Sequence, residues 1–289
     1  MVLGKAICDS YGNSVLDQGI PLRPEDIDKL AIYSVREVLI EDWLVADVLV
    51  QPLIAPELEA QAIQALRQLL TESQGSPQID DTLLEQVEEP VYAMVRELFP
   101  EVVGEVSAAG CSSAQEFRYV QPVKAAELAL LMGRKAGLRM ADLAGLGLAT
   151  LLMDVGLIML PEGDPQATRR HPERGAAILS QCKRLGPDMV VTVLQHHERW
   201  DGSGYPRGLK SDAISLSARI LAVADSYYEL VSERPERHSF MPHEAVEFIM
   251  AYSGELFDPS LVRSFARQVP LYPTGVAVKT RHVRSCHRV

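Results

Sequence analysis

The stretch His196-His197-Glu198-Arg199-Trp200-Asp201-Gly202-Ser203-Gly204-Tyr205-Pro206 is the most informative part of this 289-residue chain. Two adjacent histidines close an apolar, helix-like run at residues 189–194, and a glycine-containing loop follows at once. Neutral imidazole is the commonest side-chain metal ligand, and glycine lets a ligand approach the backbone closely. The histidine pair alone is consistent with one wall of a metal site or with a surface pair before a turn.

The composition indicates a folded protein with a sizeable core, because 47% of the residues are hydrophobic and the length suits one large domain or two ordinary ones. We find no apolar run approaching the roughly 18 residues of a membrane span and no secretion signal. The four cysteines lack paired spacing, which favours free thiols over disulfides or a zinc ribbon. We therefore expect a cytoplasmic protein without a membrane span.

The net charge of −11 is unevenly distributed. Residues 1–110 carry 6 Lys and Arg against 20 Asp and Glu, a net charge of −14, whereas residues 111–289 carry 22 against 19, a net charge of +3. This asymmetry predicts two functional regions, of which the second is the better suited to an anionic ligand. The acidic first region argues against binding of a nucleic-acid polymer.

Turn signals and short apolar runs predict a small α/β region over residues 1–55. It contains a hairpin turn at residues 11–13, between strands at 5–8 and 14–16, then a helix over 24–32 and a strand at 38–40. Apolar residues at helical spacing predict two further helices, over 56–71 and 82–99. We assign residues 56–104 to an acidic helical linker, which either packs as ordinary helices or serves as a stalk for dimerisation or signalling.

From residue 115 the pattern predicts one helix after another, so the fold class is mainly α. The expected helices cover residues 123–137, 141–155, 173–183, 187–197, 215–231, 242–252 and 259–268. Pro172 is placed at the first helical position of its helix, where proline is favoured. Residues 269–289 are expected to form a short, strand-like basic tail.

A series of strings in this region resembles the HD-GYP family of metal-dependent phosphohydrolases that degrade cyclic di-GMP. The strings occur in the family's order and are Leu151-Leu152-Met153-Asp154-Val155-Gly156-Leu157, His171-Pro172-Glu173-Arg174-Gly175, the histidine pair with its loop, Ala222-Val223-Ala224-Asp225, Ser232-Glu233-Arg234-Pro235 and Phe257-Asp258-Pro259. The resemblance covers roughly residues 115–268. It implies an HD-type helical bundle domain over residues 105–268, behind the small α/β region.

The resemblance also implies a set of site residues. Its metal ligands would be Asp154, His171, His196, His197 and Asp225, with Asp154 bridging two ions and serving in catalysis if the protein is active. Arg234 and Arg237 become candidate substrate contacts, with solvated loop charges as the alternative. The loop Gly204-Tyr205-Pro206 becomes a candidate contact for a signalling partner such as a diguanylate cyclase. A homodimer is possible.

The chain departs from the family pattern at positions that serve the second metal. Met153 stands where the family has the histidine of its His-Asp pair, Gln121 where it has an earlier histidine, and Leu157 where it has a lysine; Phe117 replaces a glutamate of some members. Thioether sulfur suits Fe(II), Mn(II) or Mg(II) poorly. We therefore expect one transition-metal ion, Fe, Mn or Zn, and a second site that is empty or holds Mg²⁺ weakly.

Two functions follow from these observations. The first is a degenerate HD-GYP-type cyclic di-GMP signalling protein with weak or absent phosphodiesterase activity, which acts by binding a cyclic dinucleotide or a partner. The alternative is an active metal-dependent cyclic di-GMP phosphodiesterase. A purely structural helical scaffold would leave the surviving ligand-type residues unexplained. Because Asp154 and Asp225 lie in apolar runs, both are expected to be buried and to need a partner.

Overall fold

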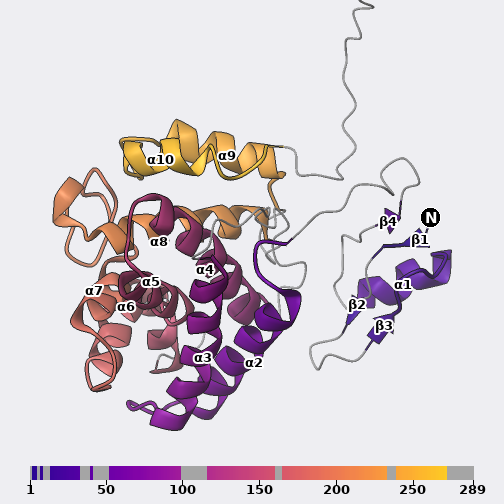
Figure 1. Ribbon diagram of the computed structural model, residues 1–289, viewed down its shortest axis with the longest axis horizontal. Helices are drawn as coiled ribbons and strands as arrows, with labels where there is room; N and C mark the ends of the chain where they lie inside the picture. Colours follow the sequence, from indigo (N-terminus) through magenta and orange to yellow (C-terminus); the bar gives the residue numbers. More distant parts are fainter. Residues whose placement is uncertain are drawn as a thin grey trace, which may run out of the picture.

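The computed structural model describes residues 2–4, 7–8, 14–32, 40–41, 52–98, 116–159, 165–232 and 239–271. Within these residues the protein has two separate hydrophobic cores. The smaller belongs to an N-terminal module and the larger to a helical body (Figure 1). The predicted fold class, mainly helical behind a small α/β region, is confirmed.

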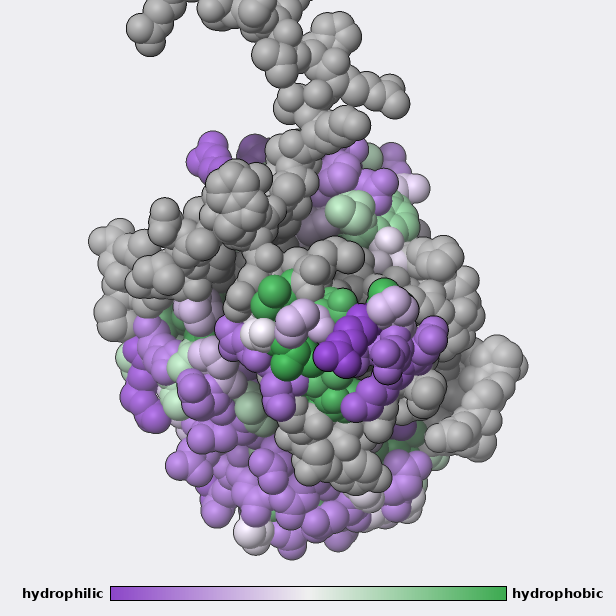
Figure 2. All heavy atoms as spheres, turned by 90° about the vertical axis from the view of Figure 1, so that its right-hand side faces the viewer, coloured by the Kyte–Doolittle hydropathy of each residue, from purple (hydrophilic) through white to green (hydrophobic). Residues whose placement is uncertain are grey.

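The N-terminal module consists of short elements around a small core. They are β1 (Val2–Leu3), β2 (Ile7–Cys8), β3 (Ser14–Leu16), α1 (Pro24–Ile32) and β4 (Ile40–Glu41). β1 pairs with β4 and β2 with β3, both antiparallel, over a core of Leu3, Leu16 and Leu30. The predicted helix and the pairing of 7–8 with 14–16 are confirmed, whereas residues 11–13 and 38–39 lie outside the described ranges. Figure 2 looks on to this side of the molecule, where apolar and strongly hydrophilic residues lie next to each other.

Helices α2 (Pro56–Glu72) and α3 (Asp81–Leu98) pack into the large core. α2 contacts α3 and α4, and α3 also contacts α5. The buried face of α2 carries Leu58, Ala62, Leu66 and Leu69, which matches the predicted helical spacing. These two helices are therefore part of the helical body. The expected boundary near residue 104 lies outside the described ranges and stays a prediction.

The remaining elements of the helical body include α4 and α5, around which the others are arranged. They are α4 (Phe117–Lys135), α5 (Met140–Leu151), the 3-10 helix η2 (Val155–Met159), α6 (Pro165–Leu179), α7 (Pro187–Gln195), the 3-10 helix η3 (Ser211–Ala213), α8 (Leu216–Val231), α9 (Pro242–Ala251) and α10 (Pro259–Phe265). α4 packs on both α5 and α8, α6 packs on η2 and α7, and α9 and α10 lie against α8 (Figure 1). The expected tail beyond residue 271 lies outside the described ranges.

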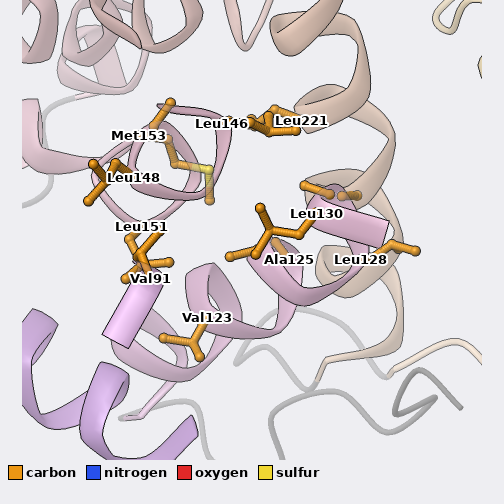
Figure 3. Packing of buried hydrophobic residues seen from close by; sticks show 14 of the residues in the cluster. Val91, Val123, Ala125, Leu128, Leu130, Leu146, Leu148, Leu151, Met153 and Leu221 are labelled. Atoms are coloured by element: carbon orange, nitrogen blue, oxygen red, sulfur yellow. The ribbon is translucent and has the colours of Figure 1, made fainter. Parts of the chain in front are cut away.

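The segment Met140–Met159, α5 followed by η2, lies at the centre of this body. Figure 3 shows Leu148, Leu151 and Met153 of this segment among apolar side chains of neighbouring helices. By length and composition alone it is apolar enough to cross a membrane, the only such helix in the described residues, so our expectation that no run approaches a span was wrong. Because 72% of its most apolar window is buried inside the protein, it behaves here as a core helix.

Three helix boundaries differ from the sequence predictions. α4 begins at Phe117, six residues early, and carries Pro122 in its interior. α5 ends at Leu151, so Asp154 lies in a turn rather than in a helix. The prediction that Pro172 opens its helix was wrong, since α6 begins at Pro165 and contains this proline. A proline normally breaks a helix interior, but packing of α6 on η2 and α7 outweighs that local preference here.

Candidate metal centre

Three histidines from two helices meet at one point of the helical body. His171 lies on α6, His196 caps the C-terminus of α7, and His197 follows it. One ring nitrogen of each lies within 4.8 Å of the corresponding atoms of the other two. Among the described residues this is the group of metal-ligating side chains compact enough to hold an ion. The fold therefore joins the predicted ligands His171, His196 and His197.

Hydrogen bonding orients His196 toward its neighbour. Its Nδ1 lies 2.6 Å from the carbonyl oxygen of Val193, so Nδ1–H donates there and the lone pair remains on Nε2. That Nε2 lies 3.0 Å from Nε2 of His171. Two nitrogens that are each about 2.1 Å from one ion, at a right angle, lie about 3.0 Å apart. The spacing of the two histidines thus fits two ligands of a single ion.

Asp154 contacts one histidine of this group without belonging to the compact set itself. Its Oδ1 lies 3.2 Å from Nε2 of His171, and 39% of its side chain is exposed. The expectation that Asp154 is buried was wrong, because it assumed that the helix runs on to Val155, whereas α5 ends at Leu151. The turn brings the carboxylate out of the apolar core beside the histidines. One carboxylate and three imidazoles suit a single transition-metal ion.

Burial keeps two of the imidazoles neutral. His196 is buried, which lowers its pKa to about 4, with a smaller opposing effect of the Asp154 charge. Burial also lowers the pKa of His197, assisted by its two histidine neighbours. A neutral imidazole can bind a metal without first losing a proton. At neutral pH both side chains are therefore ready to act as ligands.

Two glycines allow the elements that carry these ligands to approach each other. A Cβ added to Gly156 would meet the carbonyl group of His171 and lie 2.6 Å from the backbone nitrogen of Gly175. A Cβ at Gly175 would press on Gly156 N and on Val193 at 3.3 Å. η2 and α6 therefore pack backbone to backbone at this point, and a side chain of α7 closes against Gly175. Such close contact requires residues without side chains, and it brings His171 up to Asp154.

The glycine loop folds back on the histidine pair. A Cβ at Gly204 would lie 2.5 Å from the carbonyl oxygen of His197, and the N–H of Tyr205 donates to that oxygen at 3.1 Å. The carboxylate of Glu198 is buried and accepts from the N–H groups of Arg207 and Leu209, at 2.8 and 2.9 Å. Glu198 therefore fixes the far side of the loop. Sequence reasoning missed this role, because nothing in the sequence indicates that the carboxylate points inward.

Aromatic stacking joins the loop to the site. The ring of Tyr205 stacks on His197, with centroids 4.7 Å apart and an angle of 29° between the planes. The guanidinium carbon of Arg169 lies 5.2 Å from the centre of the Tyr205 ring. Burial raises the pKa of Tyr205 to about 12, and the nearby charges of Arg199, Asp154, Arg169 and Asp225 act on it more weakly. The tyrosine hydroxyl thus stays protonated near both carboxylates.

Asp225 has a different partner from Asp154. The side-chain nitrogen of Gln121, which is 2% exposed, donates to Oδ1 of Asp225. Burial, assisted by the charges of Glu229 and Asp154, raises the pKa of Asp225 to about 7. Asp225 is half-buried, against our expectation of full burial. Gln121 thus occupies one oxygen of this predicted ligand with a donor, which a metal ion would have to displace.

The positions that we expected to serve a second ion carry mostly apolar side chains. Met153 is 2% exposed and its side chain points into the apolar core (Figure 3). The carbonyl oxygen Oε1 of Gln121 is buried and lacks a hydrogen-bond partner in the described part of the chain, so it is the one unused acceptor here. Phe117 begins α4 and Leu157 lies in η2. Arg234 and Arg237 lie outside the described ranges, so their role as substrate contacts stays a prediction.

This arrangement defines a class of protein, a helical domain that gathers histidines of α6 and of the end of α7, and an aspartate of the turn after α5, at a candidate metal site. The chain belongs to the HD domain family, whose model matches residues 105–261. The fold resembles that of a HDG"Y"P protein from Bdellovibrio bacteriovorus, with a TM-score of 0.54 at 13% identity over 92% of this chain and 94% of the other. At this identity the likeness shows the fold alone.

Two curated relatives are cyclic di-GMP phosphodiesterases. One, from Pseudomonas aeruginosa, is 35% identical over 178 residues, which cover 58% of this chain and 43% of the relative. The other, a response regulator from Xanthomonas campestris pv. campestris, is 30% identical over 250 residues, 81% of this chain and 64% of the relative. The chain thus spans less than two thirds of the length of either.

Proposed function

We propose that this protein is a cytoplasmic cyclic di-GMP signalling protein that binds its ligand at a single-metal centre and hydrolyses it weakly or not at all. The observation that carries the proposal is the bond between Gln121 and Asp225. It places a neutral amide against the carboxylate that would otherwise hold a second ion. The relatives named above supply the class of ligand, a cyclic dinucleotide.

The loss of a second ion matters because of the chemistry of phosphodiesters. A pair of bound metal ions about 3.5–4 Å apart activates a water and stabilises both the attacking and leaving oxygens. Removing even an outer partner of a metal ligand typically costs about 10–100-fold in affinity or activity. Replacing two imidazoles, at Gln121 and Met153, removes direct ligands. Ligand binding at the remaining site needs only one ion and positive charge, so it tolerates this loss.

One observation favours the alternative, an active phosphodiesterase. Asp154 is 39% exposed and lies 3.2 Å from His171, so a carboxylate is available to accept a proton from a water beside the histidines. A single bound ion would supply Lewis acidity and lower the pKa of that water. In this alternative Asp154 is the catalytic residue.

The loop Gly204-Tyr205-Pro206 supports a role in partner binding. It is held by Glu198 on one side and by the stack on His197 on the other. A rigid loop loses little conformational freedom on binding. We propose that it contacts a signalling protein, such as a diguanylate cyclase, or a second copy of the chain in a homodimer.

Metal analysis and ligand assays on one sample test the proposal. Full-length protein purified with its metal should contain about one transition-metal ion per chain, bind cyclic di-GMP by calorimetry, and turn it over negligibly. The triple variant Gln121→His, Met153→His, Leu157→Lys should hold more metal and gain turnover. Robust turnover by the natural sequence, abolished by Asp154→Ala, would instead establish the alternative, and absence of bound metal would refute both.

A further inference from the structure

We propose that Arg169 is a ligand-binding residue that contacts a phosphate group of the bound nucleotide. The inference deepens the proposed function and rests on it for the identity of the ligand. Its motive is an exposed arginine that lies close to the histidine group. A cyclic dinucleotide brings two negative phosphodiesters, and a guanidinium suits their oxygens.

Arg169 lies next to the histidine group. It stands on α6 two residues before His171, and its guanidinium carbon lies 5.2 Å from the centre of the Tyr205 ring. That ring in turn stacks on His197, 4.7 Å between centroids. The Tyr205 ring thus contacts both the guanidinium of Arg169 and an imidazole of the histidine group. A ligand at the metal would thus have a positive charge beside it.

Arg169 is also free to bind. Its side chain is exposed, and it has no carboxylate partner among the residues that the structure describes. The contact with the Tyr205 ring restrains the side chain. A planar fork of N–H donors matches two phosphate oxygens at once. A restrained side chain loses less conformational freedom on binding.

The same helix offers a matched control. Arg174 is exposed as well and lies five residues further along α6, which rotates it by about 140° around the helix axis. Arg174→Ala therefore removes the same charge from the same helix, but away from the Tyr205 stack. Arg169→Lys keeps the charge of Arg169 and removes the planar fork.

The test measures binding of two probes, cyclic di-GMP and inorganic pyrophosphate, to the metal-loaded full chain by calorimetry. Arg169→Ala should weaken binding of cyclic di-GMP by about 10–100-fold, and Arg169→Lys should fall between it and the natural protein. Arg174→Ala should leave affinity unchanged. Metal content and melting temperature should be the same in the natural protein and the three variants, because Arg169 does not bind the metal and its side chain is exposed.

The outcomes separate this inference from the proposed function. Cyclic di-GMP bound equally by the natural protein and by Arg169→Ala would overturn the inference and leave the function intact. Pyrophosphate bound in an Arg169-dependent way, with no binding of cyclic di-GMP, would support the phosphate contact and refute the proposed ligand. No binding of either probe to the natural protein, or equal losses from Arg169→Ala and Arg174→Ala, would overturn the assignment of Arg169.

Discussion

Gly156→Ala should disrupt the metal centre, although Gly156 is not itself a ligand. The added Cβ would lie 2.6 Å from the backbone nitrogen of Gly175 and 2.9 Å from the carbonyl carbon of His171, and closer still to the carbonyl oxygen. Carbon atoms in contact normally lie about 3.5–4.0 Å apart, so α6 must move away by about 1 Å. Both neighbours are backbone atoms, which cannot be relieved by a change of rotamer.

The size of the effect follows from this geometry. Overpacking of this kind typically costs about 1–3 kcal/mol, and contact with backbone atoms places Gly156→Ala near the upper end. The melting temperature of the helical body should then fall by about 6–12 °C. His171 moves with α6 and leaves Asp154, from which its Nε2 is now 3.2 Å away. Metal sites tolerate distance errors of only about 0.2 Å, so affinity should fall by about 10–100-fold.

Two measurements check this prediction. Thermal unfolding of metal-free protein isolates the packing cost from stabilisation by the ion, and competition with a chelator gives the metal affinity. Gly145→Ala is the control, because a Cβ at Gly145 meets nothing within 4 Å. In α5 it should be neutral or stabilising by up to about 1 kcal/mol. If Gly156→Ala unfolds and binds metal like the natural protein, the backbone contact does not position His171.

Four further predictions concern metal content, titration and hydrogen bonding. His196→Ala should remove most of the metal and Asp225→Ala little, by elemental analysis; equal losses would contradict the single-ion centre. Because burial lowers the pKa of His196 to about 4, metal should be retained on dialysis through pH 6.5 and lost nearer pH 4. Burial raises the pKa of Glu127 from 4.5 to about 7, so the folded carboxyl keeps its proton while the unfolded one ionises. The contribution of this carboxyl to the unfolding free energy should therefore be largest below pH 4.5 and fall by on the order of 3 kcal/mol up to pH 7. In urea titrations the natural protein and Glu127→Gln should differ by this pH dependence. Glu198→Ala should lower the unfolding free energy by about 3 kcal/mol and speed hydrogen exchange of the two backbone N–H groups that the carboxylate binds. Unchanged exchange would show that Glu198 does not hold the loop in place.

Much of the fold could be read from the sequence because helical periodicity is a local property. The apolar spacing of residues 56–71 matches the buried face of α2. The predicted start of the helix at Ser215 lies within one residue of the observed one, and Asp258 caps the helix that it was expected to precede. The residue types of the candidate site were likewise visible, namely the histidines, Asp154, and the replacements Gln121 and Met153. Local signals were wrong where packing outweighed them, as at Pro172 in the interior of α6.

The tertiary structure alone decided which of these side chains meet. His171 and His196 are 25 residues apart and Gln121 and Asp225 are 104 apart, and no periodicity reports contacts over such separations. The backbone contact at Gly156 sets the first pair by bringing α6 against η2, and the packing of α4 on α8 sets the second. Asp154 is partly exposed because α5 ends at Leu151, three residues before it. Sequence therefore determined the chemistry that is available, and close packing between helices determined which groups face one another, because only the folded backbone fixes distances of a few ångströms.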